Sequence, residues 1–239
     1  MRSLILLIIA VALSGCESSE VSELKETKLP GYPTFTIEQA FENRAACGEV
    51  TWEKNEDSRG RTVINYECHM DGVDEFESRF LEDVIVSLNN LSEEETPVER
   101  SIKQVHLDAD YWDEEPDQEH ISELEEKQEQ YLSKRQKIID STIENLKARS
   151  ADIEPHFVET FRWIKIGDNE FHLDSGGYRM ASLALGNTEI DYSSYRFDTA
   201  LALVYEDIGS YEEYLQRSRI IDGINHQIGE IRRQILRSL

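Results

Sequence analysis

The feature that most constrains the fold is a long stretch of helical periodicity over residues 118–149, bracketed by Pro116 and Pro155. Apolar residues recur there three or four positions apart among glutamates and lysines, as on one face of a helix. They are Ile121, Leu124, Tyr131, Ile138, Ile139, Ile143 and Leu146. The pattern predicts one long helix, which is either an arm of a helical hairpin or a strand of a coiled coil.

The next segment changes to the alternation that is typical of strands. Apolar and polar side chains alternate over residues 157–192, with three groups of turn residues between them. The groups are Gly167-Asp168-Asn169, Ser175-Gly176-Gly177 and Gly186-Asn187. This predicts an antiparallel meander in which residues 178–185 form a strand of their own. Helical spacing then returns near Phe197–Tyr205 and after a capping signal at Ser210, so the chain is expected to be α+β.

The first sixteen residues have the form of an export signal. Arg2 supplies a positive charge, residues 4–13 are uniformly apolar, and two small residues lead directly to Cys16. The apolar run is too short to cross a bilayer as a stable helix. The ending Leu13-Ser14-Gly15-Cys16 resembles the lipobox of bacterial lipoproteins.

This resemblance implies where the protein is attached. In that family the cysteine carries acyl chains such as palmitate and becomes the first mature residue, so Cys16 is the expected membrane anchor. Residues 1–15 are then a signal peptide, and residues 16–33 a flexible tether. Glu17 departs from the aspartate that retains enteric lipoproteins at the inner membrane, which favours an outer membrane, facing the periplasm. The alternative is an ordinary secretory signal followed by a chance cysteine.

Two further cysteines indicate a disulfide. With Cys16 assigned to the anchor, Cys47 and Cys68 remain as an even pair in an oxidising compartment. We expect them to be joined, rather than to be two buried thiols. The bond would tie the end of a helix that Thr36 caps to the last strand of a hairpin. With a helix over residues 74–91, this forms a small α+β unit of disulfide-linked helix, hairpin and helix, residues 34–91.

Charge narrows the range of partners. The chain has 25 Lys and Arg against 49 Asp and Glu, a net charge of −24. Nucleic acid is a poor partner for such a chain because phosphate contacts need Lys and Arg, whereas a basic protein is favoured. The acidic residues are dense between residues 92 and 117. A calcium site around His106, Asp108, Asp110 and Asp113 is one interpretation, but the EF-hand spacing is absent, so a solvated acidic linker is favoured.

The sharpest pattern of the mature chain is a C-terminal isoleucine seam with alternating spacings of three and four. Its members are Ile221, Ile224, Ile228, Ile231 and Ile235. Isoleucine at both a and d positions favours a homo-oligomeric coiled coil. The alternative, which we prefer, is that the seam packs against residues 118–149 of the same molecule, so that residues 118–239 form one unit.

The chain contains none of the common motifs for a catalytic, cofactor or metal site. Five tyrosines near the last helices indicate either a recognition surface for peptide or sugar, or a packing layer, which we prefer. They are Tyr192, Tyr195, Tyr205, Tyr211 and Tyr214. The expected function is a non-enzymatic, lipid-anchored envelope protein that binds another protein or serves an assembly. The alternatives are an acidic inhibitor or immunity-type protein against a basic secreted enzyme and, less favoured, an envelope hydrolase with a dispersed site.

Overall fold

The computed structural model describes residues 18–184, 186–191, 194–206 and 208–239, and has the α+β fold that the sequence predicts. The strands are β1 (Cys47–Glu56), β2 (Thr62–Met70), β3 (His156–Gly167), β4 (Glu170–Ser182) and β5 (Gly186–Asp191). The first helices are α1 (Ser19–Glu26), α2 (Ile37–Phe41), α3 (Val73–Asn90) and a 3-10 turn, Leu91–Glu93. The later ones are α4 (Pro97–Trp112), α5 (Gln118–Ser150), α6 (Ser194–Tyr205), α7 (Tyr211–Arg217) and α8 (Ile220–Arg237).

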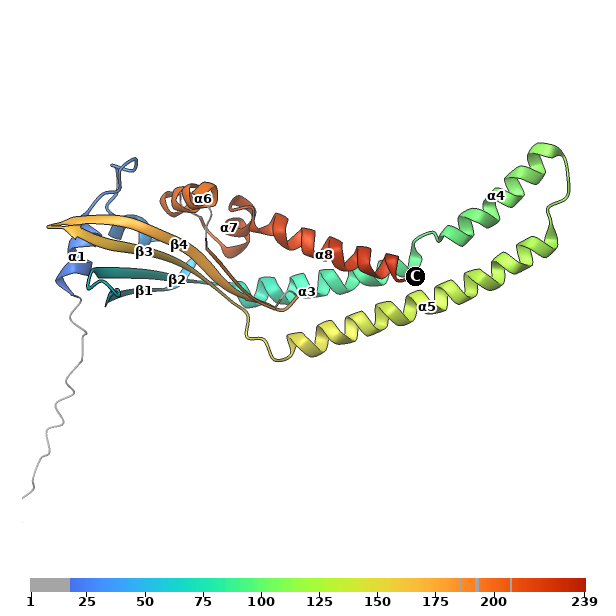
Figure 1. Ribbon diagram of the computed structural model, residues 1–239, viewed down its shortest axis with the longest axis horizontal. Helices are drawn as coiled ribbons and strands as arrows, with labels where there is room; N and C mark the ends of the chain where they lie inside the picture. The colour runs from blue at the N-terminus through green and yellow to red at the C-terminus, as the bar shows by residue number, and fades with distance from the viewer. Residues whose placement is uncertain (1–17, 185, 192–193, 207) are drawn as a thin grey trace, which may run out of the picture.

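All five strands belong to one antiparallel sheet in the order β1-β2-β3-β4-β5. The central pair, β2 and β3, aligns Val63 with Ile164 and His69 with Val158, although α3, α4 and α5 separate these strands in sequence. The predicted units 34–91 and 118–239 are therefore not separate, because each supplies strands to the same sheet. In Figure 1 the sheet occupies one end of the molecule and the inserted helices extend away from it.

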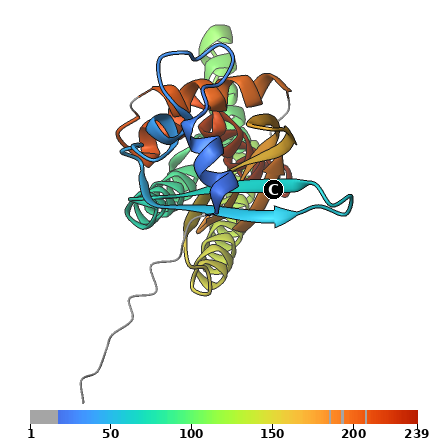
Figure 2. The same cartoon turned by 90° about the vertical axis from the view of Figure 1, so that its left-hand side faces the viewer.

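An aromatic core covers one face of the sheet. The ring of Phe41, from α2, packs edge-on against Tyr66, Phe161 and Trp163 at centroid distances of 4.9–5.3 Å. All four side chains are buried. Helices α1 and α2 and the C-terminal helices surround this core, as the end-on view of Figure 2 shows.

The isoleucine seam lies inside the molecule along much of its length. Ile224 and Ile235 are buried, whereas Ile221, Ile228 and Ile231 are partly buried. The C-terminal part of the seam packs with Val84 and Leu88 of α3 and with residues of α5. They are Ile139, Ile143 and Leu146. The preferred interpretation, packing within one molecule, is therefore the arrangement observed.

The expected tether is the clearest correction. Residues 19–26 form α1, whose N-cap Ser18 accepts a hydrogen bond from the N–H of Val21. Val21 and Leu24 are fully buried in the aromatic core, and Leu29 is also buried. The segment has few apolar residues, so its composition resembles a linker, but those few lie on one side of a helix and meet the sheet.

The expected acidic linker is a second correction. Residues 97–112 form α4, which begins with a complete capping box between Thr96 and Glu99 and with Pro97 in its first turn. These are strong signals for a helix start, and they outweigh the charge repulsion that suggested an irregular linker. With α5, which is present as predicted, α4 forms a helical hairpin.

Three local boundaries also differ from expectation. Gly176 and Gly177 lie within β4, opposite Phe161 and Thr160, so β4 continues where a turn was expected. Cys47 begins β1, because α2 ends at Phe41. The last helix is interrupted between α7 and α8, where Arg219 has a φ of 59°.

The predicted disulfide between Cys47 and Cys68 is present, with the sulfur atoms 2.09 Å apart and the Cα atoms 5.5 Å apart. It joins the start of β1 to the neighbouring strand β2. Within the described residues, no helix is both long and apolar enough to span a membrane.

Candidate functional site

The hairpin of α4 and the N-terminal half of α5 forms an arm that projects from the rest of the molecule (Figure 1), whereas Ile139, Ile143 and Leu146 of α5 pack in the core. Arg135 of α5 holds the base of the arm, and this arginine is only 3% exposed. The guanidinium of Arg135 donates hydrogen bonds to the backbone carbonyls of Ser92 and Glu94, just before α4 begins. The hydroxyl of Thr96 also donates to the side chain of Gln128, at 2.5 Å. The start of α4 is therefore fixed to α5 by polar contacts.

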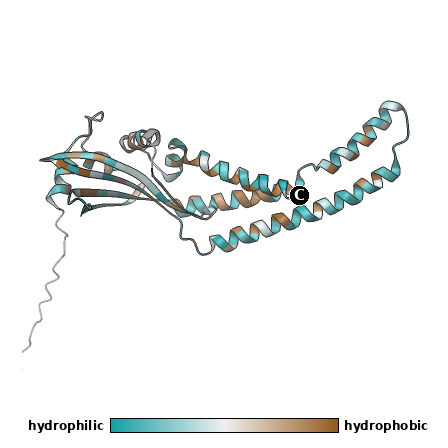
Figure 3. Ribbon diagram, in the orientation of Figure 1, coloured by the Kyte–Doolittle hydropathy of each residue, from teal (hydrophilic) through white to brown (hydrophobic). Residues whose placement is uncertain are grey.

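Beyond this base the arm has little hydrophobic packing. Ala109 is the one buried residue of α4. In the first turns of α5, Ile121 and Leu124 are buried as well. Figure 3 shows the outer part of α5 as mostly hydrophilic. An arm of this kind contributes little to the core, and its surface is available to contact other molecules.

The tip of the arm exposes large apolar side chains. Leu107, Tyr111 and Trp112 are 60%, 78% and 69% exposed, and the rings of Tyr111 and Trp112 contact each other edge-on at 4.9 Å. The chain then turns at Asp113, which has a φ of 56°, and Asp117 caps α5 by accepting from two backbone N–H groups. Exposed Trp and Tyr are over-represented where proteins bind one another.

The same tip is strongly acidic. Residues 104–126 contain ten Asp and Glu and no Lys or Arg. Among the described residues, no three His, Cys, Asp or Glu side chains are grouped so that they could hold a metal ion. The residues considered for calcium, His106, Asp108, Asp110 and Asp113, lie along α4 and its C-terminal turn. The tip thus combines exposed aromatic rings with uncompensated negative charge.

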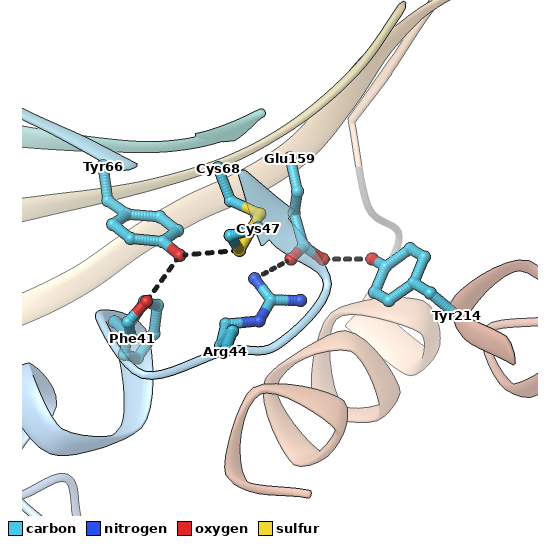
Figure 4. Close-up of a disulfide and its surroundings, with 7 residues drawn as sticks. All are labelled: Phe41, Arg44, Cys47, Tyr66, Cys68, Glu159 and Tyr214. Atoms are coloured by element: carbon cyan, nitrogen blue, oxygen red, sulfur yellow. Dashed lines mark hydrogen bonds and ion pairs between the residues drawn. A yellow bond between two sulfur atoms is a disulfide. The ribbon is translucent and has the colours of Figure 1, made fainter. Parts of the chain in front are cut away.

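A second polar feature lies inside the sheet end, next to the disulfide (Figure 4). Arg44 and Glu159 form a buried ion pair at 2.5 Å, with side chains 3% and 0% exposed. The hydroxyl of Tyr214 donates to the other oxygen of Glu159. Tyr66 donates to the carbonyl of Phe41 at 2.8 Å and lies 3.7 Å from the sulfur of Cys47.

Burial and charge shape the protonation of this cluster. Burial lowers the pKa of Arg44, but Glu159, Tyr66 and Tyr214 together raise it by more, so the guanidinium stays charged. Burial raises the pKa of Tyr66 to about 12, so its hydroxyl stays neutral. Glu159 is closed off from solvent, and its contacts with Arg44 and Tyr214 tie the segment after α2 and helix α7 to β3.

The sequence alone could not identify Arg44 and Glu159 as partners. They are 115 residues apart, and neither belongs to a recognisable motif. The tyrosines near the last helices were expected to form a packing layer, and Tyr211 and Tyr214 are indeed buried in the core. The hydroxyl of Tyr214 donates to the carboxylate of Glu159 inside the protein. Cys16 and the side chains of Tyr192 and Tyr195 lie outside the described residues.

Comparisons of the chain with protein-family models, with curated proteins and with solved structures gave no match.

Proposed function

We propose that the protein is a lipid-anchored component of a bacterial cell envelope, and that it binds a basic protein partner with the tip of its helical arm, without catalysis. The observation that carries this proposal is the tip itself, where Tyr111 and Trp112 are mostly exposed among carboxylates.

The position of the arm relative to the proposed anchor supports this function. Ser18, which caps α1, follows Cys16 by two positions, and α1 packs on the sheet. A lipid on Cys16 would therefore hold the sheet end close to the membrane. Figure 1 places α1 and the turn between α4 and α5 at opposite ends of the molecule. A 33-residue helix such as α5 is about 50 Å long, so the arm would extend well away from the membrane.

The chemistry of the tip selects the kind of partner. Anionic lipid headgroups and nucleic acid repel a surface with ten carboxylates and no Lys or Arg. A protein with a basic rim around an apolar pocket matches both features: the pocket accepts Trp112, and the rim attracts the carboxylates. Such a partner would associate faster at low salt than at high salt.

Site-specific crosslinking in intact cells tests the proposal. A photo-crosslinking amino acid is placed at Trp112, and at Gln136 as a control that is also exposed but lies on α5 away from the tip. We expect a defined adduct with one protein from Trp112 and none from Gln136. In a purified complex, Trp112→Ala should weaken binding by about thirtyfold or more, the loss of a buried aromatic anchor. Equal adducts from both positions would contradict a binding tip.

The stability of the tip variants provides the matched control. Because Trp112 is exposed, Trp112→Ala should change the free energy of unfolding by no more than about 0.5 kcal/mol. A loss of binding then reflects the contact and not unfolding. Self-crosslinks through residues 211–239 would point instead to a homo-oligomer built on α8.

The anchor is tested separately. Growth with an alkyne-labelled palmitate should label the wild-type protein, whereas Cys16→Ser should be unlabelled and should leave the membrane fraction. Retention of Cys16→Ser in washed membranes would contradict a lipid anchor.

An acidic inhibitor of a basic secreted enzyme is a second candidate, and the same acidic tip favours it. Replacing Asp108, Asp110 and Asp113 together by Asn should then abolish inhibition of that enzyme. If a crosslinked partner is identified and its activity does not change when this protein binds it, an assembly role is favoured.

A further inference from the structure

A groove at the sheet end, remote from the arm tip, has the features of a small-ligand site. Two hollows of about 250 and 310 Å³ lie between α6 and the segment from Gly31 to Arg44, and they share Phe35, Tyr205 and Glu206. Pockets for small molecules commonly measure about 300–1,000 Å³. The two adjoining hollows therefore offer space for a ligand of one or two sugar rings.

Aromatic side chains form the apolar part of this groove. Tyr32 stacks on Tyr205 with ring centroids 4.2 Å apart and planes 14° apart, which gives the groove a rigid wall. Phe35, which lines both hollows, is 46% exposed although it is large and apolar. An exposed ring beside a hollow offers its face to the C–H groups of a ligand.

The polar lining of the first hollow has unused hydrogen-bonding capacity. Gln39 accepts through Oε1 from the N–H of Thr36, and Asn43 donates through Nδ2 to the carbonyl of Gln39. Among the described residues, the amide nitrogen of Gln39 and the amide oxygen of Asn43 have no partner. Gln39 thus keeps a free donor and Asn43 a free acceptor. A ligand hydroxyl, which both donates and accepts, can bond to either.

Arg44 adds a buried donor to the same wall. The residue is 6% exposed and lines the first hollow, and its Nη1 is bonded to Glu159. Its Nη2 is buried and has no well-aligned hydrogen-bond partner among the described residues, and the nearby hydroxyl of Tyr66 helps to raise the pKa of the guanidinium. The buried hydroxyl of Tyr205, in the same lining, also has no partner there. Such groups are costly unless an acceptor or a bridging water reaches them.

The charges of the lining argue for a neutral ligand. Arg44 is balanced by Glu159, and Glu206 is paired with Arg217, so the described residues that line the two hollows include no unpaired cation. Lys28, outside this lining, donates to the carbonyl of Pro33 at 2.8 Å. The remaining features are aromatic faces, amides and single donors. From this combination we infer that the groove binds a neutral saccharide, seated against Phe35 and hydrogen-bonded by Gln39 and Asn43. This inference is independent of the proposed arm function.

Saturation-transfer NMR on the full chain tests the inference, with glucose, N-acetylglucosamine and their β-1,4-linked disaccharides as probes. We expect at least one of them to bind with a Kd of about 1 mM or tighter, and to show its strongest transfer at ring C–H protons. Phe35→Ala and Asn43→Ala should each weaken that Kd by about tenfold. Val86→Ala, which changes an exposed apolar side chain on α3 outside the groove, is the control and should leave it unchanged.

Three results would overturn the inference. The first is that no probe shows binding to the wild-type chain when the sugar concentration is about ten times the expected Kd. The second is that Phe35→Ala and Asn43→Ala, shown to be folded by their circular dichroism, bind the sugar as tightly as the wild type. The third is that inorganic phosphate or a neutral tripeptide displaces the sugar from the wild type, since the charges and shape of the groove favour neither.

Discussion

The sheet end and the arm of this protein are held together in different ways. At the sheet end, aromatic rings, a disulfide and a buried ion pair lie close together on one face of the sheet. The arm has one buried residue in α4, two apolar contacts from the start of α5, and a polar attachment through Arg135. The comparison teaches that one region maintains the fold, whereas the other can present a surface without contributing much to stability.

The largest expected effect is at the buried ion pair. Arg44→Met leaves the carboxylate of Glu159 buried beside Tyr214 without its cation, and should lower the free energy of unfolding by about 3–5 kcal/mol. Arg232→Met, which breaks an exposed pair with Glu94, is the matched control and should cost less than about 1 kcal/mol. Urea unfolding of both variants measures the difference. Similar losses would mean that the two regions are not stabilised differently.

The disulfide should have the next largest effect. Replacing Cys47 and Cys68 together by Ala removes a link across 21 residues, and should cost about 3 kcal/mol because the unfolded chain becomes freer. Wild-type protein under reducing conditions should lose about the same amount. The exchange of the α4 amides with deuterium should not change in either sample. Faster exchange in α4 would show that the arm depends on the sheet end.

A smaller and local effect is expected at the base of the arm. Arg135→Met leaves the carbonyls of Ser92 and Glu94 without their donor, which should cost about 1–3 kcal/mol. Hydrogen exchange followed by mass spectrometry should show faster exchange in α4 and unchanged exchange in the sheet. Lys137→Met, an exposed position on the same helix, is the control. Faster exchange throughout the chain would remove the distinction between arm and sheet end.

The smallest effect is a pH dependence at Glu77, a buried residue of α3. Burial raises the pKa of its carboxyl, although hydrogen bonds from Ser182 and the N–H of Leu183 partly oppose this. The folded protein therefore keeps this proton to a higher pH than the unfolded chain does. Stability should fall as the pH rises from the pKa of the unfolded carboxyl to the higher pKa in the fold.

Glu77→Gln tests this dependence because it removes the titration and keeps an acceptor for both hydrogen bonds. Denaturant unfolding over a series of pH values should show that the wild type loses stability relative to the variant as the pH rises. Parallel curves would mean that Glu77 does not titrate differently in the folded state.

Local patterns were sufficient to predict many of the elements. The spacing of apolar residues predicted α3 and α5 nearly to their ends, and the alternation after residue 156 predicted an antiparallel meander. The even pair Cys47 and Cys68 predicted the disulfide. These features depend on neighbours in sequence or on the redox compartment, so they can be read without the fold. The errors at Gly176-Gly177 and in residues 97–112 arose where composition was given more weight than pairing and capping.

The sequence by itself therefore determined the types of most elements, the disulfide, the acidic character of the arm and the isoleucine face of α8. The tertiary structure alone decided that β2 pairs with β3 across the inserted helices, that Arg44 meets Glu159, and that Val21 and Leu24 enter the core. It also decided that Trp112 is exposed rather than buried. The physical reason is that burial and pairing depend on which surfaces meet, and such contacts between distant residues leave no periodic signal in the chain.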